Sequence, residues 1–294
     1  MKHINIAFCC DDAYIVPTKI MLESLLRNNK NVSIIAHTFS DDLSKKNVKV
    51  LSTMLEECGG KLKTYQVPKI AFETIGNAPT LSHISVATYY RLLLPYVVDE
   101  TVKKVLYLDC DILIRNKIEG CYDIDLDEDI VAGVLDIHNE QFKKRLNVSE
   151  YINAGILLIN MEKMRKQFTL LQILETMNHL METLDLPMCD QDLINVMFEN
   201  QICLLPQEFN YQYVIKKKYV LKNMKEAKKA IIVHFITSDK PWKGTYVFPY
   251  LWEYYKYLRK YLSIKEKLNY WFLKPKGIVE GLKEHTKYME EHKQ

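Results

Sequence analysis

Compact apolar runs alternate with amphipathic stretches along the N-terminal half of the chain. Residues 3–10, 32–39 and 62–67 are short apolar runs typical of strands. Residues 43–58 have helical spacing and end at a Gly-Gly pair, where a left-handed C-cap needs glycine. Strands that alternate with helices in this way predict βαβ units, so the expected fold class is α/β with a largely parallel sheet.

The second half continues the pattern. Residues 105–109 are typical of an interior strand, 130–134 and 156–159 of further strands, and 163–184 of one long helix. From Leu251 onward, apolar residues recur at i, i+3 and i+4, which predicts a helical tail.

Two carboxylates interrupt the apolar segment L-Y-L-D-C-D-I-L-I. If this segment is an extended strand, Asp109 and Asp111 share one face and Cys110 points the opposite way. Two such charges repel, and their removal from water is costly unless a partner compensates. Carboxylate oxygens suit Mg²⁺ or Mn²⁺, and parallel sheets bind ligands at the carboxyl ends of their strands. The alternative is a strand that ends at Asp109, with both carboxylates capping a turn.

Other polar groups follow strand-like segments and could complete a site. His234 comes after a short apolar run and could reach the same sheet edge, although an isolated histidine is more often structural. Asp190 and Asp192 precede a helical pattern, and we expect one of them to be an N-cap. Residues 151–155 form a small-residue turn suited to close backbone approach by a ligand.

Five ordered motifs carry a family resemblance. They are H-I-S-V-A-T-Y-Y-R-L from His83, V-L-Y-L-D-C-D-I-L-I-R from Val105, N-A-G-I-L-L-I-N from Asn153, D-Q-D from Asp190 and H-x-x-x-x-x-K-P-W from His234. Over about residues 3–245 the chain resembles the family 8 retaining glycosyltransferases, especially bacterial lipopolysaccharide galactosyl- and glucosyltransferases. The resemblance implies a GT-A fold with a Rossmann-like, mostly parallel mixed sheet. It also implies a UDP-hexose donor, a saccharide or glycolipid acceptor and a Mn²⁺ or Mg²⁺ ion.

The resemblance also implies roles for individual residues. The implied metal ligands are Asp109, Asp111 and His234; the nucleotide contacts are Phe8, Cys9, Asp11, Cys110 and Lys240; the donor-sugar contacts are Arg91, Asn153, Gly155, Asp190 and Gln191; and His83 lines the acceptor pocket. Of these, Asp190 and Gln191 are the implied catalytic residues. Gln191 lies nearest the anomeric carbon in the family, and because an amide is a poor nucleophile, we expect front-face displacement. Ala13 and Thr237 depart from the family pattern, where asparagine and glycine are usual.

Positive charge is concentrated in the last third of the chain. Residues 216–229 hold seven lysines and one glutamate, and 256–276 hold seven basic residues and one acidic residue, although the whole chain carries only +3. The second segment interleaves this charge with five aromatic side chains, which suits the surface of an anionic membrane. The alternative is a helix that packs on its own domain. We expect a GT-A catalytic domain over 1–250 and a helical, basic and aromatic tail over 251–294.

Cysteine usage and hydropathy indicate the compartment. The seven cysteines are an odd number without C-x-x-C spacing, which indicates reduced thiols and not a disulfide framework or a zinc site. No run approaches the ~18 apolar residues needed to span a bilayer. We expect a cytoplasmic protein, attached peripherally to the inner face of the membrane through the tail. No nucleic-acid-binding motif accompanies the charge, so no nucleic acid partner is expected.

Two other functions compete with sugar transfer. A D-x-D phosphohydrolase would use its first aspartate as nucleophile, but its motif usually follows the first strand, whereas here it lies at Asp109 and is followed by Ile-Leu-Ile. The other alternative is a GT-A domain that binds a nucleotide sugar without transferring it. The departures at Ala13 and Thr237 leave that alternative open.

Overall fold

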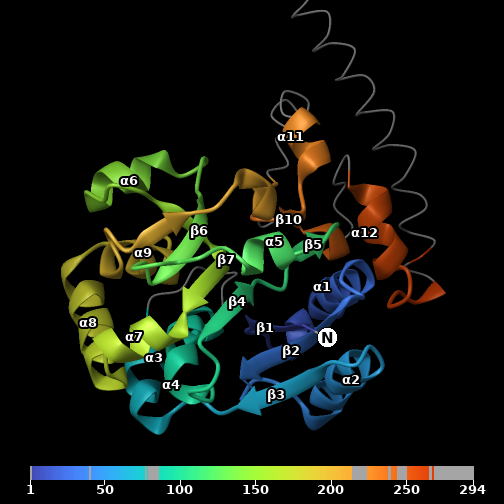
Figure 1. Ribbon diagram of the computed structural model, residues 1–294, viewed down its shortest axis with the longest axis horizontal. Helices are drawn as coiled ribbons and strands as arrows, with labels where there is room; N and C mark the ends of the chain where they lie inside the picture. The colour runs from blue at the N-terminus through green and yellow to red at the C-terminus, as the bar shows by residue number, and fades with distance from the viewer. Residues whose placement is uncertain are drawn as a thin grey trace, which may run out of the picture.

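A seven-stranded sheet forms the centre of the protein (Figure 1). The computed structural model describes residues 2–39, 41–76, 78, 86–213, 224–237, 240–243, 250–264 and 267. The strand order of the sheet is β3-β2-β1-β4-β7-β6-β8. The strands are β1 (Lys2–Phe8), β2 (Val32–Phe39), β3 (Lys61–Tyr65), β4 (Lys104–Leu108), β6 (Val131–Leu135), β7 (Ile152–Asn160) and β8 (Ile202–Leu204). Within this sheet, β7 runs antiparallel to both of its neighbours, while the other pairs are parallel. The expected mostly parallel mixed sheet is confirmed.

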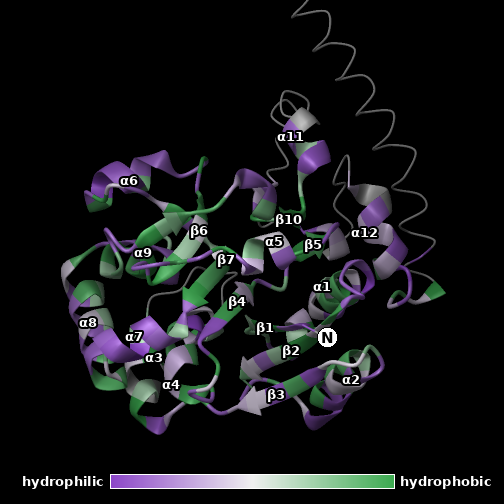
Figure 2. Cartoon of the chain, viewed as in Figure 1, coloured by the Kyte–Doolittle hydropathy of each residue, from purple (hydrophilic) through white to green (hydrophobic). Residues whose placement is uncertain are grey.

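Helices cover both faces of this sheet. The helices of the described residues are α1 (Ile15–Asn28), α2 (Lys45–Glu56), α3 (Phe72–Gly76), α4 (Leu94–Val97), α5 (Glu119–Tyr122), α6 (Glu140–Leu146), α7 (Met161–Gln167), α8 (Leu170–Thr183), α9 (Asp190–Met197), α11 (Met224–Lys229) and α12 (Leu251–Leu258), of which α11 and α12 pack beside the smaller sheet described below. In β4, Leu106 and Leu108 pack in the core that includes α1 and α2, and Val105 and Tyr107 pack in the core that includes α8 and α9. Because both faces of the strand are buried, its sequence is a continuous apolar run. Figure 2 shows the resulting contrast between the hydrophobic strand β7 and the hydrophilic helix α6.

A second sheet of three short strands lies beside the first. It has the order β5-β10-β9, formed by β5 (Ile112–Ile114), β10 (Ile232–His234) and β9 (Tyr211–Gln212). The interior strand predicted over 105–109 is confirmed as β4, but an extended strand that continues through Asp111 does not form. The chain leaves the large sheet after Leu108, and it enters the small sheet at Ile112. Asp109 to Asp111 form the connection between two sheets.

The long helix predicted over 163–184 is also wrong, because it is two helices, α7 and α8. Thr169 is the N-cap of α8, where its side chain accepts from the Gln172 backbone N–H and the Gln172 side chain accepts from the Thr169 backbone N–H. This capping box supplies acceptors for backbone N–H groups that have no intrahelical partner at a helix start. In a continuous helix the same groups would be paired within the helix. The predicted helix over 43–58 is confirmed as α2, and Gly59, with a φ of 72°, has the left-handed conformation expected there.

The first turns of the predicted tail pack on the main domain. Tyr254 and Leu258 of α12 are buried with Ile20 of α1 and Leu113 of β5, and Lys260 forms an ion pair with Glu23. Residues 268–294, which include Tyr270, Trp271 and Phe272 of the predicted membrane-binding segment, lie outside the described residues, as do residues 214–223. In the described ranges, no helix is both long and apolar enough to cross a membrane.

Buried His37 gives the fold a dependence on pH. Its Nδ1 lies 2.8 Å from Tyr65 Oη and its Nε2 lies 3.1 Å from Asn5 Oδ1. Burial lowers the pKa of His37 to about 4, with a smaller contribution from Lys63. Between about pH 6.5 and 4 the unfolded chain therefore binds a proton that the folded protein does not, so stability falls as the pH falls through this window.

We expect the free energy of unfolding to lose about 2–3 kcal/mol across this window through His37 alone. Denaturant unfolding at several pH values should show a shallower pH dependence for His37→Gln than for the wild type. His179→Gln, at an exposed position, is the matched control and should keep the wild-type slope. Equal slopes for wild type and His37→Gln would contradict the assignment.

Candidate active site

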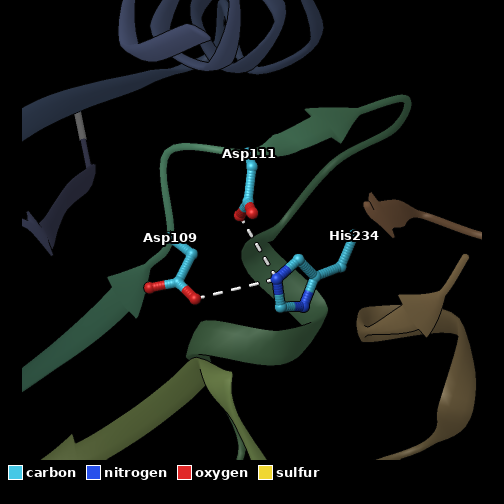
Figure 3. A group of neighbouring side chains, drawn as sticks. All are labelled: Asp109, Asp111 and His234. Carbon is cyan, nitrogen blue, oxygen red and sulfur yellow. Dashed lines mark ion pairs between the residues drawn. The ribbon is translucent and has the colours of Figure 1, made fainter. Parts of the chain in front are cut away.

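Two aspartates and a histidine converge where the two sheets meet. Asp109 follows β4, Asp111 precedes β5, and His234 ends β10 (Figure 3). The pairing of β10 with β5 places His234 opposite Ile112, next to Asp111 in the chain. His234 Nε2 lies 3.2 Å from Asp111 Oδ1 and 3.7 Å from Asp109 Oδ2. The second sheet therefore brings together residues that are more than 120 positions apart in sequence.

This trio fits a divalent cation. One ligand atom from each residue lies within 4.8 Å of the others. Atoms held at about 2.1 Å from Mg²⁺ in an octahedral arrangement are about 3–4 Å apart, so small adjustments suffice. Among the residues that the structure describes, Asp111 Oδ1 is a buried oxygen that accepts no hydrogen bond. Carboxylate oxygens with one imidazole nitrogen suit Mn²⁺ or Mg²⁺.

Lys240 lies against the same cluster. Its Nζ donates to Asp111 Oδ2 at 2.6 Å and to the Phe235 carbonyl at 2.6 Å. Burial by itself would raise the pKa of Asp111, but the positive charge of Lys240 outweighs it and lowers that pKa. Burial does raise the pKa of Asp109, opposed by Arg91 and reinforced by Asp111. The two carboxylates therefore differ: Asp111 is held ionised, and Asp109 is the one that a cation would stabilise.

Arg91 connects the candidate metal cluster (Asp109, Asp111 and His234) to the predicted donor-sugar residues. The guanidinium lies 3.2 Å from Asp109 Oδ1 and 2.9 Å from Asp190 Oδ2, and it is nearly completely buried. Asp190 also accepts a hydrogen bond from Thr88 Oγ1 at 2.6 Å. Burial raises the pKa of Asp190 to about 6 even though Arg91 opposes the shift. Arg91 thus compensates two buried carboxylates at once.

Neither Asp190 nor Asp192 is the N-cap of α9, so this prediction is wrong. The N-cap is Cys189, whose side chain makes no capping hydrogen bond. Asp190 is used by Arg91, and Asp192 accepts from Tyr151 Oη at 2.5 Å and from the Met188 N–H at 2.7 Å. Partners distant in sequence use both carboxylates, which a capping pattern cannot reveal.

Gln191 is held from both ends of its amide. Its Oε1 accepts from Asn153 Nδ2 and from the Ala154 N–H, each at 3.1 Å, and its Nε2 donates to Asp136 Oδ2 at 2.9 Å. Gln191 and Asn153 are both buried. The predicted donor-sugar residues therefore form one rigid group.

The turn predicted over 151–155 is wrong, because Gly155 lies inside β7. Here the pairing between β6 and β7 shifts register between Gly133 and Val134. A Cβ placed on Gly155 would lie 2.1 Å from His234 Cε1 and 2.9 Å from Asp109 Oδ2. Only glycine leaves room for both side chains, so the close approach expected here involves two of the candidate metal ligands.

The predicted nucleotide contacts surround the same cavity, with one exception. Cys9, Asp11, Cys110 and Lys240 all line it, together with the metal cluster and Arg91. Phe8 is fully buried in the core beneath the end of β1, so its side chain does not line the cavity. Cys110 Sγ donates to the Cys9 carbonyl at 3.3 Å, which ties the two chain segments together.

Some predicted positions are not tested, and some site residues were missed. His83, the predicted acceptor contact, lies outside the described residues, and the predicted role of each site residue stays a prediction. Thr88 lies in the motif that begins at His83 but was given no role, and sequence patterns gave no signal for Asp136, Asn210 and Tyr14. Each of the four contacts a predicted site residue or lines the cavity. They are recognised only because the folded chain brings them into contact with the predicted site residues or with the cavity.

Comparison with known proteins agrees with this geometry. Residues 5–246 match the model of glycosyl transferase family 8. General stress protein A of Bacillus subtilis (strain 168) is 29% identical over 268 residues, which are 87% of this chain and 93% of that protein. A lipopolysaccharide 1,2-glucosyltransferase of Escherichia coli is 25% identical over 249 residues, which are 81% of this chain and 73% of that enzyme.

A solved structure supports the fold. The galactosyltransferase LgtC, in complex with donor and acceptor sugar analogues, superposes with a TM-score of 0.75 at 22% identity, covering 90% of this chain and 100% of that one. This likeness confirms the predicted GT-A fold. With the family match over most of its length, the chain belongs to glycosyltransferase family 8 and is a glycosyltransferase.

Proposed function

We propose that the enzyme transfers glucose or galactose from a UDP-hexose to a saccharide acceptor with retention of configuration, using Mn²⁺ or Mg²⁺. The observation that carries the proposal is the convergence of Asp109, Asp111 and His234 beside Lys240 in one cavity. Family membership removes the phosphohydrolase alternative.

Asp109, Asp111 and His234 would hold the cation, which supplies electrostatic stabilisation of a leaving diphosphate. Lys240 adds a second positive charge near the same place, since its Nζ is 2.6 Å from Asp111. A β-phosphate gains negative charge as the sugar leaves, so a fixed ammonium group here favours the transition state over the ground state. Arg91 holds Asp190 against the other side of the cavity.

The carboxylate of Asp190 would stabilise positive charge that develops on the sugar ring. Gln191 is not expected to act as a nucleophile, because both hydrogen bonds accepted by its Oε1 come from protein groups. An amide oxygen used in this way is a poor nucleophile, which favours front-face displacement over a covalent intermediate. In front-face displacement the leaving phosphate helps to deprotonate the acceptor hydroxyl.

The acceptor class follows from the relatives. One of them is named as a lipopolysaccharide glucosyltransferase, so we propose a saccharide of a cell-surface glycan as acceptor. Peripheral attachment to an anionic membrane through the tail stays a prediction, and its test removes residues 256–294. Sedimentation with anionic vesicles tests it, and a chain without these residues that sediments equally would contradict it.

A donor screen by calorimetry tests the proposal. With Mn²⁺ present, UDP-glucose or UDP-galactose should bind and should slowly release UDP, whereas both signals should disappear after chelation of the metal. GDP-mannose is the control and should not bind. Binding that is independent of the metal would contradict the proposal, and metal-dependent binding without any UDP release would favour the domain that binds without transferring.

A further inference from the structure

A chain of buried amides runs from the metal cluster to the predicted donor-sugar residues. His234 Nδ1 lies 3.1 Å from Asn210 Oδ1, and Asn210 Nδ2 donates to Asn153 Oδ1 at 2.9 Å. Asn153 Nδ2 in turn donates to Gln191 Oε1. Asn210 is completely buried, and His234, Asn153 and Gln191 are at most 6% exposed. The Asn210 side chain therefore depends on its protein neighbours and not on water for its hydrogen bonds.

Two backbone N–H groups fix the direction of every hydrogen bond in this chain. Gly155 donates to the Asn153 side chain at 3.0 Å, and an N–H can only donate, so the accepting atom must be the Asn153 oxygen. That oxygen faces Asn210, so Asn210 presents its NH₂ group to Asn153 and its oxygen to His234. Ala154 fixes the Gln191 oxygen in the same way. The orientation of each amide follows without ambiguity.

This direction decides which nitrogen of His234 carries the proton. Since Asn210 offers an oxygen, His234 Nδ1 must carry hydrogen, which leaves Nε2 of the neutral ring with its lone pair. Nε2 is the atom that faces the two aspartates at 3.2 and 3.7 Å. A lone pair directed at two carboxylates is repulsive by itself and favourable around a cation.

We propose that Asn210 is a positioning residue that holds His234 in the metal-binding tautomer and couples the metal cluster to Asn153 and Gln191. It rests on the proposed function, because the role of the trio as metal ligands is part of that proposal. Partners of this kind around metal-bound histidines fix the ring and raise its basicity. The coupling has a chemical use, since the diphosphate at the metal and the sugar held by the amides belong to the same donor molecule.

Two substitutions separate the two hydrogen bonds of Asn210. Asn210→Ala removes both of them, and we expect it to weaken Mn²⁺ binding by about 10- to 100-fold. Asn210→Asp keeps an oxygen for His234 but cannot donate to Asn153. It should therefore bind Mn²⁺ within about threefold of the wild type, yet bind UDP-glucose more weakly relative to UDP than the wild type does. Free Mn²⁺ measured by electron paramagnetic resonance, and calorimetry with UDP and UDP-glucose, give these affinities.

Asn29→Ala is the matched control for loss of a buried asparagine. Asn29 is 3% exposed, donates to the Leu25 carbonyl and accepts from the Ile118 N–H, away from the cavity. This variant should lose stability but keep wild-type Mn²⁺ affinity. Thermal unfolding of all variants separates loss of folding from loss of positioning.

A spectroscopic readout tests the tautomer directly. In the diamagnetic complex with Mg²⁺ and UDP, nitrogen-15 NMR of histidine should show a proton on His234 Nδ1, assigned by its absence in His234→Gln. The proton signal should move downfield in Asn210→Asp, because a carboxylate is the stronger acceptor.

The outcomes are distinguishable. A wild-type protein that binds no Mn²⁺ would contradict the proposed function. Normal wild-type binding with equal affinity in Asn210→Ala would contradict only the role of Asn210, as would a His234 proton signal that is unchanged in Asn210→Asp.

Discussion

Asp111→Asn should lower Mn²⁺-dependent UDP release from a UDP-hexose by about 100- to 1,000-fold. Asp111 would supply one oxygen to the cation, and its other oxygen accepts from Lys240 at 2.6 Å. The substitution keeps the shape of the side chain and removes its charge, so it weakens cation binding and also leaves Lys240 without its carboxylate partner. Both losses act where charge develops on the leaving phosphate, so the effect should be large in kcat as well as in metal affinity.

Initial rates of UDP release over a range of Mn²⁺ concentrations measure this effect. Asp123→Asn is the matched control, because Asp123 also pairs with a lysine, Lys2, but at an exposed site far from the cavity. Surface pairs of this kind contribute little, so the control should keep its rate and its stability. Equal rates for Asp111→Asn and the wild type at every metal concentration would refute the assignment of Asp111.

Local sequence patterns predicted the large sheet well but not the junction between the sheets. The predicted strand over 32–39 is β2 itself, because a strand buried on both faces leaves a long apolar run. The run around Asp109 is equally apolar on both sides, yet the chain changes sheets there. Hydrophobicity reports that a segment is buried, and it does not report which neighbour buries it. Pairing with β10, which lies far along the chain, decides this.

The candidate site divides in the same way. The residues alone suggested Asp109, Asp111 and His234 as candidate ligands only weakly, since D-x-D and a strand-end histidine are weak signals separately, and the family motifs in their order strengthened the prediction. Asn210 and Asp136 carried no signal at all, because a buried asparagine or aspartate looks like any loop residue until its partner is known. The roles of these two residues follow from their hydrogen bonds, and these bonds form only in the folded structure.

Gly155→Ala should weaken Mn²⁺ binding by about 100-fold, more than most changes around a metal ligand, because the added methyl group takes the place of the ligand itself. The new Cβ would lie 2.1 Å from His234 Cε1 and 2.7 Å from His234 Nδ1, distances that no packing allows. The backbone of Gly155 cannot easily retreat, because its N–H donates to Asn153 at 3.0 Å and its carbonyl accepts from the Asp109 N–H at 2.7 Å. The imidazole must therefore move, and overpacking should also destabilise the fold by about 1–3 kcal/mol.

Gly76→Ala provides the comparison, since a Cβ at Gly76 meets nothing within 4 Å. Titration with Mn²⁺ and thermal unfolding should leave that variant close to the wild type. If Gly155→Ala bound Mn²⁺ as tightly as Gly76→Ala, His234 would have another position from which to coordinate, and its rigid placement by Asn210 would be contradicted as well. A selective loss in Gly155→Ala would instead indicate that metal affinity depends on the space beside His234 that this glycine leaves free. The register shift in β7 would then be part of the metal site, because it brings a strand backbone against two ligands where a side chain would otherwise stand.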